Sequence, residues 1–156
     1  MPKLIISIVI CCFNLSVYSQ GFINANKPET KKYLSIYTAK EKVQTLTTES
    51  DTSITFLVRD SIVQNLDLLL QFNESGKCSR ELRVFSCDSC YRKILNTTLA
   101  EKYWGWTEIN SKTYFSKFKK HLILNVQVAG SLSYEIRSLE LSKKEFKRRL
   151  KKQVEE

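Results

Sequence analysis

Apolar and polar side chains alternate along several segments of the chain, which is the pattern of β-strands with one buried face. In residues 66–72 every second side chain is leucine or phenylalanine, and in residues 122–128 every second side chain is leucine or valine. Polar turns that contain glycine, at residues 73–77 and 129–131, join neighbouring strands as hairpins. The pattern therefore predicts an antiparallel sheet. Shorter strand-like runs lie at residues 54–58, 82–85, 114–118 and 134–141.

Helical periodicity is seen in two further segments. Residues 33–46 fit a helix only in part, because threonines dilute the apolar positions. Residues 87–104 fit better, since serine and aspartate side chains at residues 86–89 can cap the first turn and Gly105 can close the last one. Together with the strands, this central helix predicts an α+β fold in which one helix packs on the antiparallel sheet.

The C-terminal segment predicts an amphipathic helix. Ser142 and Glu145 match a capping box, and Leu141 and Phe146 occupy the two positions of a hydrophobic staple. A basic helix of this kind predicts contact with an anionic surface, whereas the alternative is a solvated helix that leans on the sheet through a narrow apolar stripe. The candidate contact residues are Lys143, Lys144, Lys147, Arg148, Arg149, Lys151 and Lys152.

The first residues of the chain, 1–19, resemble a secretory signal peptide. A single lysine precedes an unbroken apolar run at residues 4–13, which is too short to span a membrane. Small residues before Gln20 fit a cleavage site. A buried helix or an uncleaved anchor is the alternative, and lipid attachment at Cys11 or Cys12 lacks the small preceding residue that such processing uses. The chain is therefore predicted to be secreted or periplasmic, with no transmembrane segment after cleavage.

The rest of the chain is long enough for one domain. It is predicted to comprise a flexible N-terminal arm over residues 20–32, around Pro28, and a single α+β domain over residues 33–156. The whole sequence contains 25 Lys and Arg against 16 Asp and Glu, a formal net charge of +9. A basic surface favours anionic partners, and export argues against nucleic acid and for an envelope protein or an anionic surface.

Three cysteines lie in the predicted domain: Cys78, Cys87 and Cys90. In an oxidising compartment they are expected to pair, either Cys78 with one of the others or Cys87 with Cys90. A disulfide across so short a loop stabilises the fold by about 2 kcal/mol. Cys87 to Cys90 is also a C-x-x-C at a helix start, where the helix dipole favours a thiolate, so thiol-disulfide exchange is the alternative. The proline that faces the cysteines in thioredoxin-like proteins is missing.

Other chemistry finds little support in the sequence. Cys78, Cys87, Cys90 and His121 can supply zinc ligands, but the second closely spaced pair typical of structural zinc is missing. Haem attachment fails because Tyr91 stands where a histidine is required. The sequence contains no glycine-rich phosphate loop, no paired-carboxylate signature and no nucleophile-histidine motif, so it predicts no cofactor, no metal and no catalytic residue. This indicates a binding module rather than an enzyme.

The order of strand, turn at residues 73–77, strand, helix, tryptophan and strand resembles the small C-terminal domain of TonB-like periplasmic proteins. The resemblance covers about residues 66–128 and rests on the order of elements, to which this chain adds cysteines and a basic C-terminal helix. In its Lys, Asn, Ile and Ser bias the chain also resembles small exported proteins of Bacteroidota, a resemblance that carries no activity with it. The sequence therefore predicts a small exported binding or envelope-associated protein.

Overall fold

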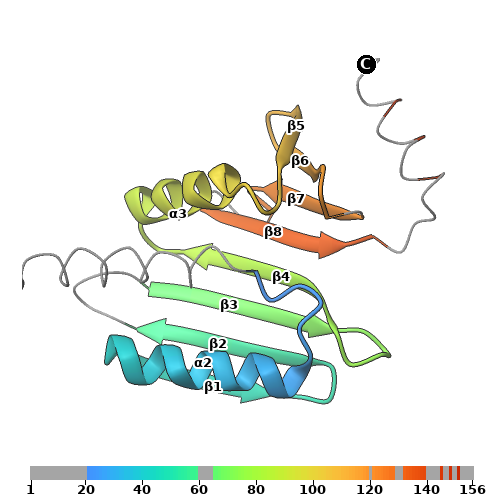
Figure 1. The fold of residues 1–156 in the computed structure, drawn as a ribbon. Helices are drawn as coiled ribbons and strands as arrows, with labels where there is room; N and C mark the ends of the chain where they lie inside the picture. The colour runs from blue at the N-terminus through green and yellow to red at the C-terminus, as the bar shows by residue number, and fades with distance from the viewer. Residues whose placement is uncertain are drawn as a thin grey trace, which may run out of the picture.

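The described residues form one antiparallel sheet of eight strands and two helices, an α+β fold (Figure 1). The computed structural model describes residues 21–59, 65–119, 121–128 and 132–139, together with Glu145, Arg148 and Lys151. The helices are α2 (Lys27–Glu41) and α3 (Asp88–Ala100). The strands are β1 (Gln44–Glu49), β2 (Ser53–Arg59), β3 (Asn65–Phe72), β4 (Cys78–Phe85), β5 (Trp106–Asn110), β6 (Thr113–Ser116), β7 (Leu122–Val126) and β8 (Ser133–Ser138).

The strand order is β1-β2-β3-β4-β8-β7-β6-β5, so the connectivity repeats. Each half is a helix followed by four consecutive strands, and the last strands of the two halves, β4 and β8, pair antiparallel at the centre of the sheet. This arrangement is a two-fold repeat of topology. It has no counterpart in the sequence, where no internal repeat is evident.

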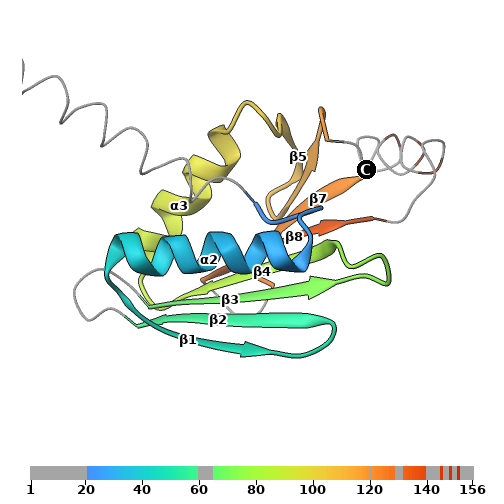
Figure 2. The ribbon, with the colours of Figure 1, turned by 60° about the horizontal axis from the view of Figure 1, so that its bottom comes forward.

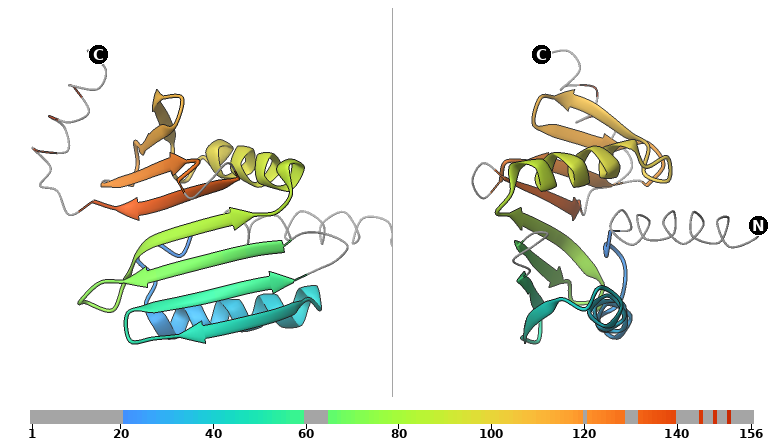
Figure 3. Two further views of the ribbon diagram at one scale, coloured as in Figure 1. Left: turned by 180° about the vertical axis from the view of Figure 1, so that it is seen from behind. Right: turned by 90° about the vertical axis from the view of Figure 1, so that its left-hand side faces the viewer.

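Both helices pack on the same face of the sheet (Figure 2). The register places Phe56 opposite Leu68, Leu68 opposite Arg83 and Arg83 opposite Tyr134, so these four side chains share one face. Residues of α2 pack against Phe56 and residues of α3 pack against Tyr134. Seen from behind, the β1–β2 end of the sheet lies in front of α2 (Figure 3).

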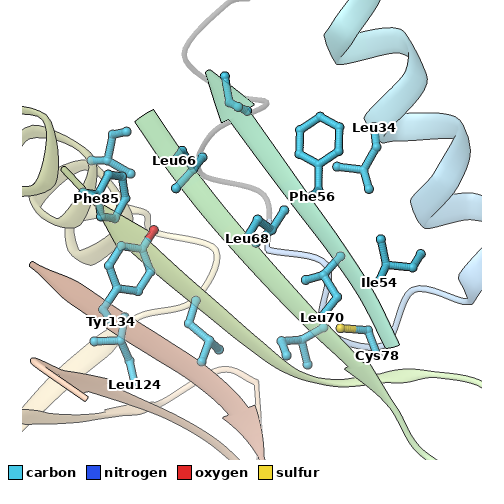
Figure 4. Packing of buried hydrophobic residues seen from close by; sticks show 14 of the residues in the cluster. Leu34, Ile54, Phe56, Leu66, Leu68, Leu70, Cys78, Phe85, Leu124 and Tyr134 are labelled. Carbon is cyan, nitrogen blue, oxygen red and sulfur yellow. The ribbon is translucent and has the colours of Figure 1, made fainter. Parts of the chain in front are cut away.

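The core lies between this face and the helices. Its members include the alternating residues of β3 that the sequence pattern predicts, together with alternating residues of β2, and Ile54 and Leu70 are fully buried (Figure 4). The predicted hairpin between β3 and β4 is confirmed, since Gly76 adopts a positive φ of 72° in its turn. The antiparallel pairing of β7 with β8 is confirmed as well.

The beginning of the fold differs from the prediction of a flexible arm over residues 20–32. Asn26 caps α2 in a capping box with Glu29, so the helix begins at Lys27. Proline in the first turn favours this start, because its fixed φ suits a helix and its missing N–H is not needed there. Before the helix, the Asn24 N–H donates to the Cys78 carbonyl oxygen at 2.8 Å. This segment is therefore part of the packed domain.

Three other boundaries are corrected. The helix expected at residues 33–46 ends at Glu41, and its threonine-rich end forms the edge strand β1. The second helix, α3, is capped by the Cys87 sulfur rather than by a serine or aspartate, and it ends at Ala100, before Gly105. Strand β5 was not anticipated. The prediction of one central packing helix is therefore incomplete, since α2 covers the other half of the sheet.

Two of the sequence predictions fall outside the described residues. These are the signal peptide over residues 1–19 and most of the predicted C-terminal helix, of which Arg148 and Lys151 are described and exposed. Within the part of the chain that the structure describes, neither helix has the length and apolar character needed to cross a bilayer.

Candidate functional site

A partly open pocket lies between α2 and the sheet. The empty space within and in front of it, open solvent included, is about 410 Å³. Strands β2, β3 and β4, helix α2 and the segment before α2 all contribute to its wall. The lining residues are Phe22, Leu34, Tyr37, Phe56, Leu66, Leu68 and Arg83.

The pocket walls are apolar. Phe56, Leu66 and Leu68 point from β2 and β3 toward Leu34 of α2 (Figure 4), because the alternation along these strands turns every second side chain to the helix side. The ring of Tyr37 meets the ring of Phe56 edge to face, with centroids 6.1 Å apart. These contacts form the pocket from ordinary core positions, so its shape is fixed by the packing of α2 on the sheet.

A buried ion pair lies at the sheet side of the pocket. Glu81 is fully buried and Arg83 is 4% exposed, and both side chains project from β4 toward the helices. Arg83 donates from Nε and Nη2 to Glu81 Oε1, at 2.6 Å and 2.5 Å. The backbone N–H of Phe22 donates to Glu81 Oε2 at 2.7 Å. The carboxylate therefore binds the N-terminal segment and the arginine together.

The charge of Arg83 is compensated within the protein. Burial on its own would lower the pKa of Arg83, but the Glu81 carboxylate and Tyr134 outweigh it and raise the pKa above its ordinary value. The guanidinium carbon lies 5.6 Å from the centroid of the Tyr134 ring. The guanidinium is therefore a permanent cation with its counter-charge beside it.

Tyr134 connects this ion pair to the other half of the sheet. Its hydroxyl lies 3.2 Å from that of Thr98 on α3, and its ring stacks on Phe85 at a centroid distance of 6.0 Å. Burial raises the pKa of Tyr134 above the ordinary value, so the phenol stays neutral. A chain of polar contacts thus runs from the pocket to α3 across the β4–β8 pair.

The three cysteines predicted as a cluster separate into a pair and a single residue. Cys87 and Cys90 form a disulfide at the start of α3, while Cys78 is a free thiol with 1% of its surface exposed. Burial, followed by the nearby Glu81 carboxylate, raises the pKa of Cys78 to about 12. The pairing of the C-x-x-C residues is one of the alternatives that the sequence left open.

The zinc alternative required Cys78, Cys87, Cys90 and His121 to converge. The disulfide occupies two of these sulfurs, and among the described residues no group of three or more His, Cys, Asp or Glu side chains is placed to hold a metal ion. The basic residues of the predicted C-terminal helix lie for the most part outside the described residues, so they remain a prediction.

The pocket and its ion pair were missed from the sequence. The apolar residues Leu82, Val84 and Phe85 predict strand β4, but they do not by themselves show which side of the sheet its charged residues face. Glu81 and Arg83 have the same parity as Phe85, which places two charges on the core face. Charges at core-facing strand positions are rare, and this parity is the signal that could have identified them.

Searches against protein-family models, curated proteins and solved structures found no match. The fold and the pocket define the class of the protein. It is an α+β protein with an apolar pocket beside a buried ion pair in which the two charges compensate each other.

Proposed function

We propose that this chain is an exported binding protein that holds a small, mostly apolar molecule in the pocket between α2 and the sheet. The observation that carries the proposal is the pocket itself, which combines apolar walls with two residues that carry polar groups, Tyr37 and Arg83. Binding sites for small molecules are concave and largely apolar with few polar groups, and this pocket has the same character. The proposed export rests on the apolar leader, and places the ligand among the molecules of an envelope or extracellular space.

The chemistry of the pocket favours an uncharged ligand. Glu81 Oε1 lies 2.5 Å from Arg83 Nη2, so the carboxylate neutralises the charge of the guanidinium. A ligand therefore does not need to carry a negative charge. A charged ligand would also lose its hydration on entry, which is costly among leucine and phenylalanine side chains. The expected class is therefore a neutral apolar or weakly amphiphilic molecule, such as an aromatic compound or a short acyl chain.

Filling the pocket is expected to abolish binding of a neutral apolar probe. With the chain that begins at Gln20, N-phenyl-1-naphthylamine fluorescence should rise saturably on binding. Leu66→Trp places an indole in the pocket from β3, and the apparent affinity should fall by about tenfold or more, which corresponds to about 1.4 kcal/mol. Leu34→Trp fills the pocket from the opposite wall, on α2, and should lower the affinity in the same way. This second variant keeps the test available if Leu66→Trp folds poorly.

The matched control is Leu69→Trp. Leu69 lies on the same strand, is 38% exposed, and faces the other side of the sheet. This variant should bind the probe as the unchanged chain does, and thermal melts should show that all variants are folded. Equal binding by Leu66→Trp, Leu34→Trp and Leu69→Trp would show that the probe binds elsewhere, and the proposal would then be wrong.

A second candidate function is thiol-disulfide exchange through Cys87 and Cys90. It is favoured by the position of the disulfide, which spans the first turn of α3 and is partly exposed. The Cys90 N–H donates to the Cys87 sulfur at 3.2 Å, a contact that would also stabilise a Cys87 thiolate. In such an exchange the disulfide accepts two electrons and two protons from a client dithiol, whose own sulfurs become bonded.

Thiol titration separates this candidate from a purely structural disulfide. The unreduced folded chain that begins at Gln20 should show no thiol reactive toward dithionitrobenzoate, since Cys78 is buried with a pKa of about 12. After mild reduction, thiolate absorbance followed against pH measures the Cys87 pKa. A value well below the ordinary 8.5 or so supports exchange. A value at or above it supports the structural role, with Cys87→Ala/Cys90→Ala losing about 2 kcal/mol of stability.

A further inference from the structure

Two exposed aromatic side chains and three lysines lie at the turn between α3 and β5 and at the end of β6. Phe118 is 67% exposed, the highest value among the large hydrophobic side chains that the structure describes, and Tyr103 is 58% exposed. We call these two residues, together with Lys102, Lys117 and Lys119, the aromatic-lysine patch. None of them lines the pocket, so the patch is separate from the proposed ligand site.

The backbone holds the two aromatic residues close together. Beyond the end of β6 the chain continues beside the segment that follows α3, with the Lys117 N–H donating to the Gly105 carbonyl oxygen at 2.9 Å. Ser116 Oγ donates to the Trp104 carbonyl oxygen and accepts from the Lys119 N–H. Exposed aromatics on such a braced turn lose little conformational freedom on binding.

Gly105 allows Phe118 to lie against this backbone. Its φ is +56°, and a Cβ there would lie 2.5 Å from the nearest ring atom of Phe118. On the other side, Tyr103 meets Trp104 edge to face with centroids 5.1 Å apart. Each ring thus packs against the protein on one side and is exposed to solvent on the other. Burying the exposed surface against a partner would be favourable because of the hydrophobic effect.

The charge of the patch is positive. Lys102 and Lys117 are exposed, and the Lys119 ammonium lies 3.8 Å from the centroid of the Tyr103 ring. Residues 101–105 and 116–119 contain three lysines against one acidic residue, Glu101. The lysine ammonium groups and the aromatic rings therefore lie on one surface. A partner that binds both kinds of side chain has negative charges at its surface and an apolar layer beneath them.

We propose that the aromatic-lysine patch binds the surface of an anionic lipid bilayer. Aromatic rings partition into the interface between headgroups and acyl chains, and lysines beside them are attracted by anionic headgroups. The net charge of +9 on the whole chain supports approach to such a surface. This inference does not depend on the pocket, and it places membrane contact at residues other than the predicted C-terminal helix.

The test is co-sedimentation with vesicles, using the chain that begins at Gln20 so that the apolar leader is absent. The unchanged chain should bind vesicles of phosphatidylcholine with 30% phosphatidylglycerol and should bind pure phosphatidylcholine far more weakly. Tyr103→Ser/Phe118→Ser should weaken binding to the anionic vesicles by about tenfold or more. Lys117→Gln/Lys119→Gln should weaken it by about 25-fold at low salt, on the basis of about fivefold for each lysine.

The matched control is Tyr33→Ser on α2. Tyr33 is 51% exposed and also has lysine neighbours in the sequence. One of these, Lys31, forms an ion pair with Glu49 at 2.8 Å, so its charge is already compensated. This variant should bind as the unchanged chain does. A chain truncated before Ser142 should keep most of its binding. Bilayers that contain bromine-labelled lipid should quench the fluorescence of Trp104 and Trp106, which adjoin the patch.

Three outcomes would overturn the proposal. The first is loss of binding on truncation before Ser142 with no effect of the patch variants, since it would assign the membrane contact to the C-terminal segment. The second is equal weakening by Tyr33→Ser and by the patch variants, which would show non-specific adsorption. The third is binding to an acidic polysaccharide, at low salt, without binding to anionic vesicles.

Discussion

Replacing Glu81 by glutamine is expected to destabilise the folded chain by about 3–5 kcal/mol, an effect comparable with the total stability of many domains. The amide keeps the shape of the side chain, so the loss comes from charge. Arg83, 4% exposed, would keep its positive charge in the core without the carboxylate that compensates it. Urea denaturation at neutral pH measures the change as a lower midpoint with an unchanged slope.

Two further variants test this explanation. In Glu81→Leu/Arg83→Met both charges are removed, and stability should recover to within about 2 kcal/mol of the unchanged chain, because a buried pair often contributes little beyond an apolar pair of similar volume. Glu49→Gln removes a carboxylate that binds Lys27 and Lys31 in solvent, and should change stability little. A small effect of Glu81→Gln, similar to that of Glu49→Gln, would contradict the buried placement of the ion pair.

Replacing Leu70 by alanine is expected to cost about 2–5 kcal/mol. Leu70 is fully buried and lies between Ile54 of β2 and Glu81 of β4, so truncation leaves a cavity that neighbouring strands cannot close. The same change at Leu69, which is 38% exposed on the opposite face, should cost less than about 1 kcal/mol. Thermal or urea unfolding of the two variants gives the comparison.

This pair of variants tests the strand register directly. A shift of one residue in β3 would exchange the faces of Leu69 and Leu70, and the larger loss would then be found at Leu69. The result would also bear on the pocket, since Leu66 and Leu68 share the face of Leu70. A larger loss at Leu69 would contradict the fold as described.

The sequence pattern was sufficient where a strand has one buried face and one open face. In β3 the apolar side chains at every second position, Leu66, Leu68, Leu70 and Phe72, predict both the strand and its buried side. Residues 27–49 were harder to interpret. The helix there is held by its cap at Asn26 and by the burial of Thr30 and Leu34, and its threonine-rich continuation becomes a strand only because β2 pairs with it.

The candidate sites depend on contacts between distant segments, which a single sequence does not reveal. The residues that line the pocket are spread along the chain from Phe22 to Arg83. The size of the pocket depends on how closely α2 approaches β2 and β3. The aromatic-lysine patch is similar: Tyr103 and Phe118 are brought together by backbone pairing across the β5–β6 hairpin. The cysteine pairing, in contrast, was among the stated alternatives because Cys87 and Cys90 are close in sequence.

The repeated connectivity divides the sheet into two units, each of one helix and four strands, which meet where β4 pairs with β8. The link between the units is short, since α3 begins three residues after β4 ends. The residues that line the pocket belong to the first unit or, in the case of Phe22, to the segment just before it, whereas the aromatic-lysine patch belongs to the second unit. The proposed ligand pocket and the proposed membrane contact therefore lie in different halves of the sheet, so a substitution in one is expected to leave the other unchanged.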